Sequence, residues 1–443
     1  MKTILPAADS VLKLLGKPTR SDACRLMHSV VFADVPEGVL LFHLLTGELL
    51  LLSHEEYEHL YELPALYGHW FLVPETTGDY KLTEQVRTVL SLLQKGPEHI
   101  TGYTIFTTTE CNARCFYCYE KNIRKERMST ETALETAAFI ARNHGCDPVR
   151  LSWFGGEPLY HAKVIDLITE ALREKEIPFH SSMISNAYLL DAETVGKAKE
   201  LWNLSRVQIT LDGTRDVYNR TKDYIYRDDN NPFETVLTNI GHCLDSGIRV
   251  TVRMNMTMSN ADDLLDLSRL LADRFGENSC LTAYSAVLFQ LAQGDRGQAE
   301  ELYARQRELD SLLEEKHLHH IGPIPRGLKL HRCMADSDRS VTVLPDGRLG
   351  CCEHDTADVI IGSVREGFTD VGKKALYRER LAPIDACRDC FYAPLCIRLE
   401  KCEPDAHCTE GFRKMLLSVV KAQMKNAFYQ RTVCDEEPEA ENC

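Results

Sequence analysis

The sequence predicts an α/β protein in which a partial (β/α)6 TIM-like barrel lies between a winged-helix-like α+β unit and a C-terminal cysteine-rich domain. Six strand-like segments alternate with amphipathic helical segments between residues 101 and 316. Three short apolar runs separated by turn residues precede them, and eight cysteines follow from Cys333 to Cys408. A chain of 443 residues exceeds one ordinary domain, so several compact parts are expected.

The strand–helix alternation is the main evidence for the barrel. Consecutive βα units form a parallel sheet, open or curved into an incomplete barrel, and ligands bind at the carboxyl ends of its strands. We expect strands at Tyr103–Thr107, Arg150–Phe154, Phe179–Ile184, Arg206–Leu211, Arg249–Asn255 and Leu281–Phe289. We expect helices at Ser129–Asn143, Ala162–Lys175, Ala192–Trp202, Pro232–Ser246, Ala261–Arg274 and Gln298–Lys316.

The regions on either side of the barrel have their own patterns. Three apolar runs near the N-terminus, followed by two helical patterns, predict the winged-helix-like unit, with a mere capping segment as the alternative. They are Ser29–Phe32, Val39–Phe42 and Leu49–Leu52. A glycine- and proline-rich linker follows residue 320. The expected division is therefore 1–98, 99–320, 321–410 and 411–443, the last part being a helix and an acidic tail.

Composition narrows the classes of function. A formal net charge of -15 argues against nucleic acid as the main partner. No apolar run reaches the ~20 residues of a membrane span, and Met1–Lys17 has no signal-peptide pattern. Seventeen cysteines in a chain expected to be cytoplasmic indicate metal binding or catalysis, because thiols stay reduced there.

The first group of cysteines is a C-x3-C-x2-C loop directly after the first barrel strand. Cys111, Cys115 and Cys118 can bind three irons of a [4Fe–4S] cluster from one loop. The fourth iron then stays open, and an open coordination position is typical of catalytic metal sites. Neighbouring aromatic residues such as Tyr117 would shield the cluster. The alternative is a zinc knuckle that lacks a fourth ligand.

This loop resembles the signature of the radical SAM superfamily. The resemblance implies that the amino and carboxylate groups of S-adenosylmethionine bind the open iron. Reduction of the cluster would then release a 5′-deoxyadenosyl radical, with the protein positioning the cofactor and excluding water. It also implies that Cys111, Cys115 and Cys118 are catalytic and that Tyr117 belongs to the cofactor site.

Three later strand ends, together with a position on the fifth strand, resemble the same superfamily and would contribute cofactor-binding residues. The Gly-Gly-Glu-Pro motif after the second strand resembles the contact to the ammonium group of S-adenosylmethionine, because glycines let backbone approach a ligand closely. Relatives carry Thr-Asn-Gly where this chain has Ser-Asn-Ala, a small departure. Each motif alone is as readily a turn or a helix cap. The expected contacts are Gly155, Gly156, Glu157, Ser185, Asn186, Thr210, Asp212 and Arg253.

The late cysteines resemble a SPASM domain, which carries two auxiliary [4Fe–4S] clusters and would bring the total to three. By the usual interleaving, the outer cluster would bind Cys387, Cys390, Cys396 and Cys408. The inner cluster would bind Cys333, Cys352 and Cys402, with Cys351 as an optional fourth ligand. The chain departs from the family at Glu400, where a cysteine is expected, so an open inner iron is an alternative. A zinc ribbon is the structural alternative for the region.

The resemblance implies a radical SAM enzyme that matures a ribosomally made peptide. Hydrogen abstraction followed by transfer of a second electron to an auxiliary cluster would form a thioether or carbon–carbon crosslink. Glu353 is a candidate general base. The expected partners are a precursor peptide, whose leader adds to an edge strand of the N-terminal unit, and a flavodoxin- or ferredoxin-type electron donor. Alternatives are an anaerobic sulfatase maturase that forms formylglycine, a zinc scaffold and an iron–sulfur electron carrier.

Overall fold

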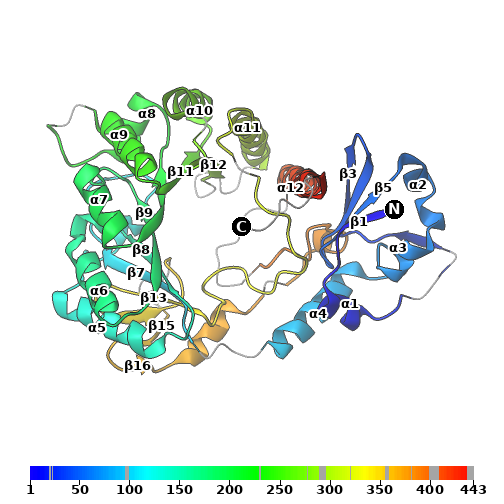
Figure 1. Cartoon of the computed structure of the whole chain (residues 1–443), viewed down its shortest axis with the longest axis horizontal. Helices are drawn as coiled ribbons and strands as arrows, with labels where there is room; N and C mark the ends of the chain where they lie inside the picture. Colours follow the sequence, from blue (N-terminus) through cyan, green and yellow to red (C-terminus); the bar gives the residue numbers. More distant parts are fainter. Residues whose placement is uncertain are drawn as a thin grey trace. The chain divides into compact units, whose positions relative to one another are not determined.

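One mixed sheet organises the larger part of the chain in the computed structural model (Figure 1). The structure describes residues 1–18, 21, 23–94, 99–228, 231–276, 278–288, 296–319, 321–354, 359–380, 382–398 and 409–436. Two compact units divide the chain. Unit 1 contains residues 1–95, 321–332 and 380–443, and unit 2 contains residues 96–320 and 333–379. The four-part division expected from the sequence stays a prediction.

Unit 2 contains a run of six parallel strands in the order β12-β11-β10-β9-β8-β7. The strands are β7 Gly102–Thr108, β8 Val149–Gly155, β9 Phe179–Ser185, β10 Leu204–Thr210, β11 Arg249–Met256 and β12 Leu281–Val287. Their helices are α5 Thr130–Asn143, α6 Lys163–Glu174, α7 Ala192–Glu200, α8 Arg215–Lys222, α9 Pro232–Asp245, α10 Ala261–Phe275 and α11 Arg296–Glu315. The predicted α/β class and incomplete barrel are confirmed.

The helices cover the outer face of this sheet, as Figure 1 shows for α5, α6, α7 and α9. Alternate residues along each strand are buried against them, for example Leu151 and Trp153 on β8. Side chains on the opposite, inner face are mostly only half-buried, such as Ser152 on β8 and Gln208 on β10. The outer face therefore forms the core, and the inner face stays open to a ligand.

Four short strands from the cysteine-rich region extend this sheet. β13 Ser340–Val343 pairs parallel with β7, and antiparallel pairs then add β14 Arg348–Gly350, β15 Ile360–Ser363 and β16 Gly367–Phe368. The sequence analysis missed them, because segments of two to four residues are too short for a periodic pattern.

Unit 1 contains a four-stranded antiparallel sheet in the order β1-β5-β4-β3. Its strands are β1 Lys2–Leu5, β3 Val30–Val35, β4 Gly38–His43 and β5 Glu48–Leu52, and a two-stranded ribbon pairs β2 Cys24–Leu26 with β6 Leu72–Pro74. Its helices are α1 Asp9–Leu15, α2 His54–Glu58, α3 Pro64–Gly68, α4 Asp79–Leu93 and α12 Glu410–Glu436. The three predicted strands are present, and β1 adds a fourth.

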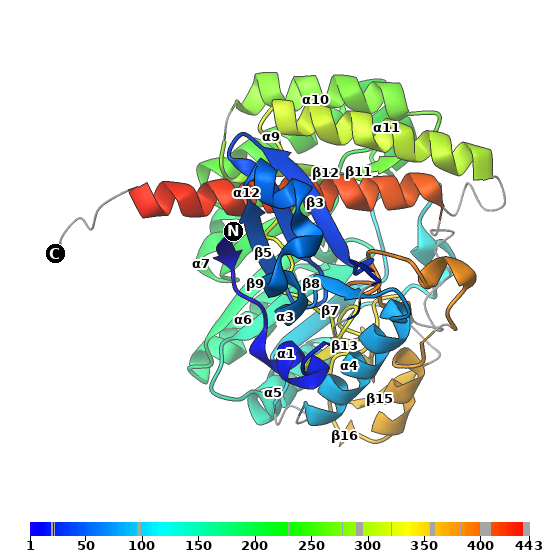
Figure 2. The ribbon, with the colours of Figure 1, turned by 90° about the vertical axis from the view of Figure 1, so that its right-hand side faces the viewer.

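The sheet of unit 1 is covered on both faces. Leu60, in a short 3-10 helix before α3, and Leu66 of α3 pack on one face. Helix α12 covers the other face with Val420, Met424 and Phe428 (Figure 2). The N-terminal strands and the C-terminal helix thus share one apolar core.

No helix in the described ranges is both long enough and apolar enough to cross a membrane.

Candidate active site

The predicted site residues of unit 2 gather where the parallel strands end. The cysteine loop follows β7, the two glycines end and follow β8, Ser185 ends β9, and Thr210 ends β10. Arg253 on β11 lies in register with Thr210 on β10. Because parallel strands place their carboxyl ends at one edge, residues from five strands meet there. The structure brings together the loop and all the expected cofactor contacts.

The cysteine loop is held by backbone and side-chain hydrogen bonds. The Thr109 hydroxyl donates to the carbonyl of Arg124 at 2.7 Å, which folds the loop back on itself. The backbone N–H of Arg114 donates to the carbonyl of Lys222 at 2.7 Å, and that of Ile225 donates to Asn112 at 2.9 Å. The segment that follows α8 therefore fixes the middle of the loop.

Burial and nearby negative charge act on the first thiol. Burial raises the pKa of Cys111 to about 12, and the charges of Glu157, Cys115 and Cys118 contribute in the same direction. Such a thiol ionises at neutral pH only when a cation compensates the thiolate, as a bound metal does. The mutual charge effects also show that the three thiols lie near one another.

The donor set fits an iron–sulfur cube. Each thiolate of a cube binds its own iron, so the ligands need not converge on one point. In the described parts of the chain, no three His, Cys, Asp or Glu side chains converge as a single-ion site requires. Cys111, Cys115 and Cys118 would hold three irons, and the strand ends beside them would hold the cofactor on the fourth.

The two glycines allow β8 to lie against this loop. A Cβ atom on Gly156 would lie 2.3 Å from the carbonyl oxygen of Glu110, far inside van der Waals contact. Gly155 has φ of +124°, and its Cβ would lie 2.0 Å from the Thr108 carbonyl oxygen. The structure thus gives both glycines a role in packing the loop. Their predicted contact with S-adenosylmethionine stays a prediction.

Glu157 joins the ends of β8 and β9. Its carboxylate is 1% exposed and accepts hydrogen bonds from the Ser185 hydroxyl at 2.8 Å and from the backbone N–H groups of Asn186 at 2.8 Å and Leu159 at 3.2 Å. Burial raises the pKa of Glu157 to about 7, although these hydrogen bonds act in the opposite direction. Both carboxylate oxygens therefore already have protein partners.

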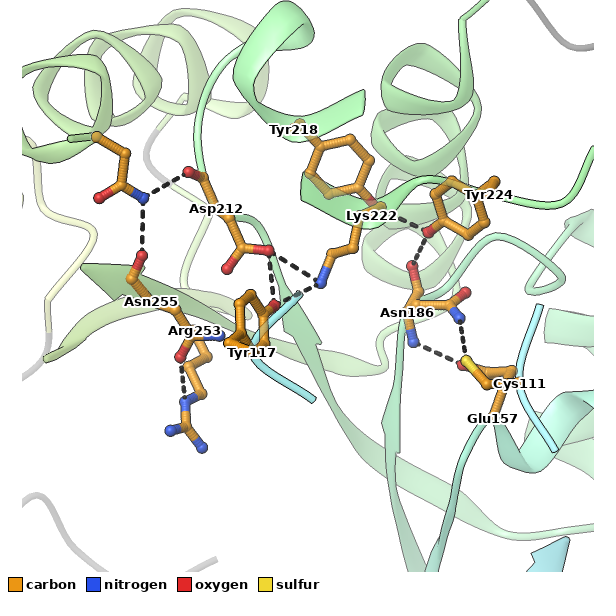
Figure 3. Close-up of polar contacts among 11 residues, drawn as sticks. Cys111, Tyr117, Glu157, Asn186, Asp212, Tyr218, Lys222, Tyr224, Arg253 and Asn255 are labelled. Atoms are coloured by element: carbon orange, nitrogen blue, oxygen red, sulfur yellow. Dashed lines mark hydrogen bonds and ion pairs between the residues drawn. The ribbon is translucent and has the colours of Figure 1, made fainter. Parts of the chain in front are cut away.

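Asn186 links β9 to the cysteine loop. Its side-chain amide donates to the Asn112 side-chain oxygen at 2.7 Å. The same amide lies 3.9 Å from the Cys111 sulfur (Figure 3). Its carbonyl accepts from the Tyr224 hydroxyl at 3.4 Å. The sequence analysis missed Asn112 and Tyr224, which carry no motif signal of their own.

A buried ion pair lies beside Tyr117. Lys222 Nζ is 3.1 Å from Asp212 Oδ2, and their side chains are only 4% and 2% exposed. The Tyr117 hydroxyl donates to the same oxygen at 2.7 Å and accepts from Lys222 at 3.1 Å (Figure 3). Burial would lower the pKa of Lys222, but the charge of Asp212 raises it well above its usual value. The sequence analysis missed Lys222, which ends α8.

The second oxygen of Asp212 is available to a ligand. Asp212 Oδ1 is buried and has no hydrogen-bond partner in the described part of the protein. A buried unsatisfied acceptor is costly, which favours a donor such as a hydroxyl or ammonium group of a cofactor. This atom is the clearest structural sign of a ligand position at the strand ends.

Arg253 and Tyr284 lie on the inner face of the neighbouring strands. Arg253 Nε donates to the side chain of Asn255 at 2.9 Å, and its guanidinium points away from Asp212 (Figure 3). Tyr284 lies in register with Arg253 on β12, and its hydroxyl donates to Gln208 at 3.1 Å. A cation next to two polar side chains provides donors for a carboxylate or a ribose.

The late cysteines fall in both units. Cys333, Cys351 and Cys352 belong to unit 2, whereas Cys387, Cys390 and Cys396 belong to unit 1. Cys402 and Cys408 lie outside the described residues. The described cysteines of the expected outer set thus all belong to unit 1, and those of the expected inner set all belong to unit 2. The assignment of these cysteines to two clusters stays a prediction.

The turn after Cys352 lies against the first cysteine loop within unit 2. The ring of His354 is 4.4 Å from the ring of Tyr119, measured between centroids. Glu353 is also near this tyrosine, because its charge contributes to raising the pKa of Tyr119, after the larger effect of burial. The structure therefore places Glu353 close to the cysteine loop, and its role as general base stays a prediction.

Comparison with known proteins agrees with this geometry. Residues 105–271 match the model of the radical SAM superfamily. The chain contains a radical SAM domain. Proteins of that superfamily bind a [4Fe–4S] cluster and S-adenosylmethionine, and the loop and strand ends described above fit both.

Two curated relatives have different reactions in their names. The Fe-coproporphyrin III synthase of Methanosarcina barkeri is 30% identical over 169 residues, which are 38% of this chain and 39% of that protein. The GTP 3′,8-cyclase of Clostridium perfringens strain 13 is 30% identical over 176 residues, which are 38% of this chain and 51% of the cyclase. The chain thus spans about two fifths to one half of the length of these relatives.

Solved structures share the fold over a larger part of the chain. The structure of anSMEcpe with bound AdoMet and the Cp18Cys peptide has a TM-score of 0.53 at 13% identity, covering 75% of this chain and 98% of that one. Streptococcus suis SuiB bound to precursor peptide SuiA has a TM-score of 0.51 at 12% identity, covering 84% of this chain and 94% of that one. The likeness therefore extends well beyond the radical SAM domain.

Proposed function

We propose that this chain is a radical SAM enzyme that modifies a ribosomally made peptide and forms a thioether or carbon–carbon crosslink. The observation that carries the proposal is the half-buried three-cysteine loop at the carboxyl ends of the parallel strands, next to an unsatisfied Asp212 oxygen. When bound, the cluster and S-adenosylmethionine supply a 5′-deoxyadenosyl radical that removes one hydrogen atom from the substrate. An external flavodoxin- or ferredoxin-type donor supplies the first electron.

The residues at the strand ends bind and orient the cofactor. Asp212 offers a free acceptor oxygen, and the ion pair with Lys222 holds its carboxylate in place. Glu157 fixes the end of β9, so that Asn186 stays directed at the cysteine loop. Tyr117 shields the cysteine loop from water, because burial and the Asp212–Lys222 pair hold its ring.

Two features support a peptide substrate. The solved structures of SuiB and anSMEcpe contain bound peptides, and their fold extends over three quarters or more of this chain. In unit 1, β3 is an edge strand of its sheet within the described residues. The carbonyl of Ser29 accepts a hydrogen bond from the backbone N–H of Leu44. In an antiparallel pair, every second residue of a strand bonds to its neighbour, so the N–H groups of Phe32 and Asp34 point away from β4. These groups can pair with an extended leader peptide.

The first test is the release of 5′-deoxyadenosine from S-adenosylmethionine under reducing, anaerobic conditions. Cys115→Ala should abolish it, because the cluster loses one of its three ligands. Cys146→Ala removes an exposed thiol outside the loop and should leave the release unchanged. Release that persists in Cys115→Ala would show that this loop is not the cofactor site.

The second test is co-expression with a candidate cysteine-rich precursor peptide, followed by mass spectrometry. A crosslink should remove about two hydrogens from the peptide. A peptide that instead reacts with an aldehyde probe would indicate formylglycine formation, the sulfatase-maturase alternative. An unchanged peptide across a panel of candidates, with turnover of another substrate, would contradict the proposal.

The edge of β3 can be tested by one substitution. Asp34→Pro removes a backbone N–H that faces away from β4, and should weaken leader binding at least tenfold if the leader pairs there. Asp34→Ala keeps the N–H and should bind like the wild type. Equal loss of affinity in both variants would assign the effect to the side chain.

A nucleotide substrate is the second candidate, favoured by the 30% identity to a GTP 3′,8-cyclase. That identity covers only 38% of this chain. Incubation of the reduced enzyme with S-adenosylmethionine and GTP distinguishes the candidates: consumption of GTP would support the nucleotide, and unchanged GTP would support the peptide.

A further inference from the structure

Arg87 on helix α4 is a buried cation that the candidate active site does not use. It is 3% exposed, although arginine is rarely buried unless it is paired. All its guanidinium nitrogens have partners, and three of these bonds go to backbone carbonyls far away in the sequence. Such a residue fixes the segments that it bridges.

The segment that Arg87 holds is the spacer of the late C-x2-C-x5-C motif. Nη2 of Arg87 donates to the carbonyls of Ala393 at 2.7 Å and Pro394 at 2.8 Å, both between Cys390 and Cys396. Nε donates to the carbonyl of Lys329 at 3.1 Å. Lys329 in turn donates its backbone N–H to Pro394 at 3.0 Å. One guanidinium therefore joins α4, the linker and the cysteine loop inside unit 1.

Two backbone turns fold the loop that carries Cys387, Cys390 and Cys396. The backbone N–H of Cys390 donates to the carbonyl of Cys387 at 3.3 Å, and that of Cys396 donates to Tyr392 at 3.0 Å. These turns reverse the chain between the three cysteines, all of which are half-buried. Three thiols on one short folded loop fit an iron–sulfur cluster as donors.

The charge around Arg87 also favours a negatively charged cluster. Nη1 of Arg87 is paired with Glu84, which is also paired with Arg380. Two guanidiniums share one carboxylate, so this group carries a net positive charge. Burial and Arg380 lower the pKa of Arg87, and the charges of Glu84 and Cys396 offset part of this effect, which places the Cys396 thiol near the guanidinium.

We propose that Arg87 is a positioning residue for an auxiliary iron–sulfur cluster on Cys387, Cys390 and Cys396. Its fork of donors shapes the loop, and the net positive charge of the Arg87–Glu84–Arg380 group stabilises the reduced, more negative cluster. This inference rests on the proposed auxiliary clusters. It makes the N-terminal region part of the cluster site, because α4 belongs to residues 1–95.

The test uses a background in which Cys111, Cys115 and Cys118 are all alanine, so that the remaining iron belongs to the late cysteines. In this background Cys387→Ala should remove about four irons, the content of one cube. Arg87→Gln should lose part of this iron, and the Arg87→Gln/Cys387→Ala double variant should lose no more than Cys387→Ala alone. Iron is counted by chemical analysis and by the EPR signal of the reduced protein.

The reduction potential of the auxiliary cluster distinguishes a positioning role of Arg87 from a purely structural one. A cluster that Arg87→Gln retains should have a lower potential than in the background, because one positive charge is gone. Arg87→Lys keeps the charge but not the fork, so it should lose iron while keeping the potential of the remaining cluster. Should Arg87→Gln fail to fold, Arg87→Lys still tests the predicted loss of iron. Arg173→Gln removes an arginine that also binds two backbone carbonyls, in unit 2, and should change neither quantity.

The outcomes distinguish the two proposals. Iron content and potential that stay unchanged in Arg87→Gln would overturn the role of Arg87 alone. A background protein without iron, or one whose iron is insensitive to Cys387→Ala, would overturn the auxiliary cluster and this inference together. The proposed release of 5′-deoxyadenosine by the Cys111 loop is unaffected by either result.

Discussion

Lys222→Met is the substitution whose effect the structure defines most closely. The side chains of Lys222 and Asp212 are 4% and 2% exposed, and their charged atoms are 3.1 Å apart. Breaking a buried ion pair by removing one partner leaves an uncompensated charge and costs about 3–5 kcal/mol. The exposed Lys197–Asp166 pair on the same unit, at 47% and 23% exposure, is the matched control, and Lys197→Met should cost at most about 1 kcal/mol.

The assay is denaturant unfolding of the apoprotein, followed by tryptophan fluorescence. Trp153 and Trp202 are fully buried in unit 2, whereas Trp70 belongs to unit 1. A Trp70→Phe background therefore reports the unfolding of unit 2 alone, which matters because two units need not unfold in one transition.

A double variant completes the test of this ion pair. Adding Asp212→Asn to Lys222→Met removes the stranded charge, so the double variant should be more stable than Lys222→Met alone. A free energy of unfolding in Lys222→Met within about 1 kcal/mol of the background would refute the reasoning, because surface pairs have effects of that size. So would strictly additive effects of the two substitutions.

Two further predictions concern the loop and unit 1. Gly156→Ala should displace the cysteine loop and lower its iron content, because the new Cβ would lie 2.3 Å from the Glu110 carbonyl oxygen. Gly196→Ala is the control and should keep the iron, because the space around Gly196 is open. Burial lowers the pKa of His43 to about 4 from the usual 6.5, so unit 1 should lose up to about 3 kcal/mol of stability as the pH falls from 6.5 to 4. His43→Gln should remove this loss in unfolding followed by Trp70 fluorescence, and an unchanged pH profile would contradict it.

Much of unit 2 could be predicted from local patterns. The alternation of apolar residues predicted the six parallel strands to within two residues at every end, because strand and helix periods differ clearly over segments of this length. The late strands β13 to β16 were not predicted, because the pairing of such short strands depends on tertiary packing. Nothing local shows that residues 340–343 pair with β7.

The sequence also grouped residues by motif but could not assign their contacts. Glu157 was expected to contact the cofactor, and the structure shows its oxygens bound by Ser185, Asn186 and Leu159. Other residues of the site, such as Lys222, belong to no motif. They could be identified only from the three-dimensional structure.

By itself, the sequence determined the barrel class and the three-cysteine loop. Both depend on local spacing: that of apolar residues along each strand and helix, and that of the cysteines within one loop. Only the tertiary structure decided which groups are paired. Tyr117 meets Asp212 across 95 residues and Lys222 across 105, and Arg87 meets Ala393 across 306. Charges and polar groups so far apart in sequence are paired only because burial removes their water, and which partner replaces it depends on how the whole chain packs.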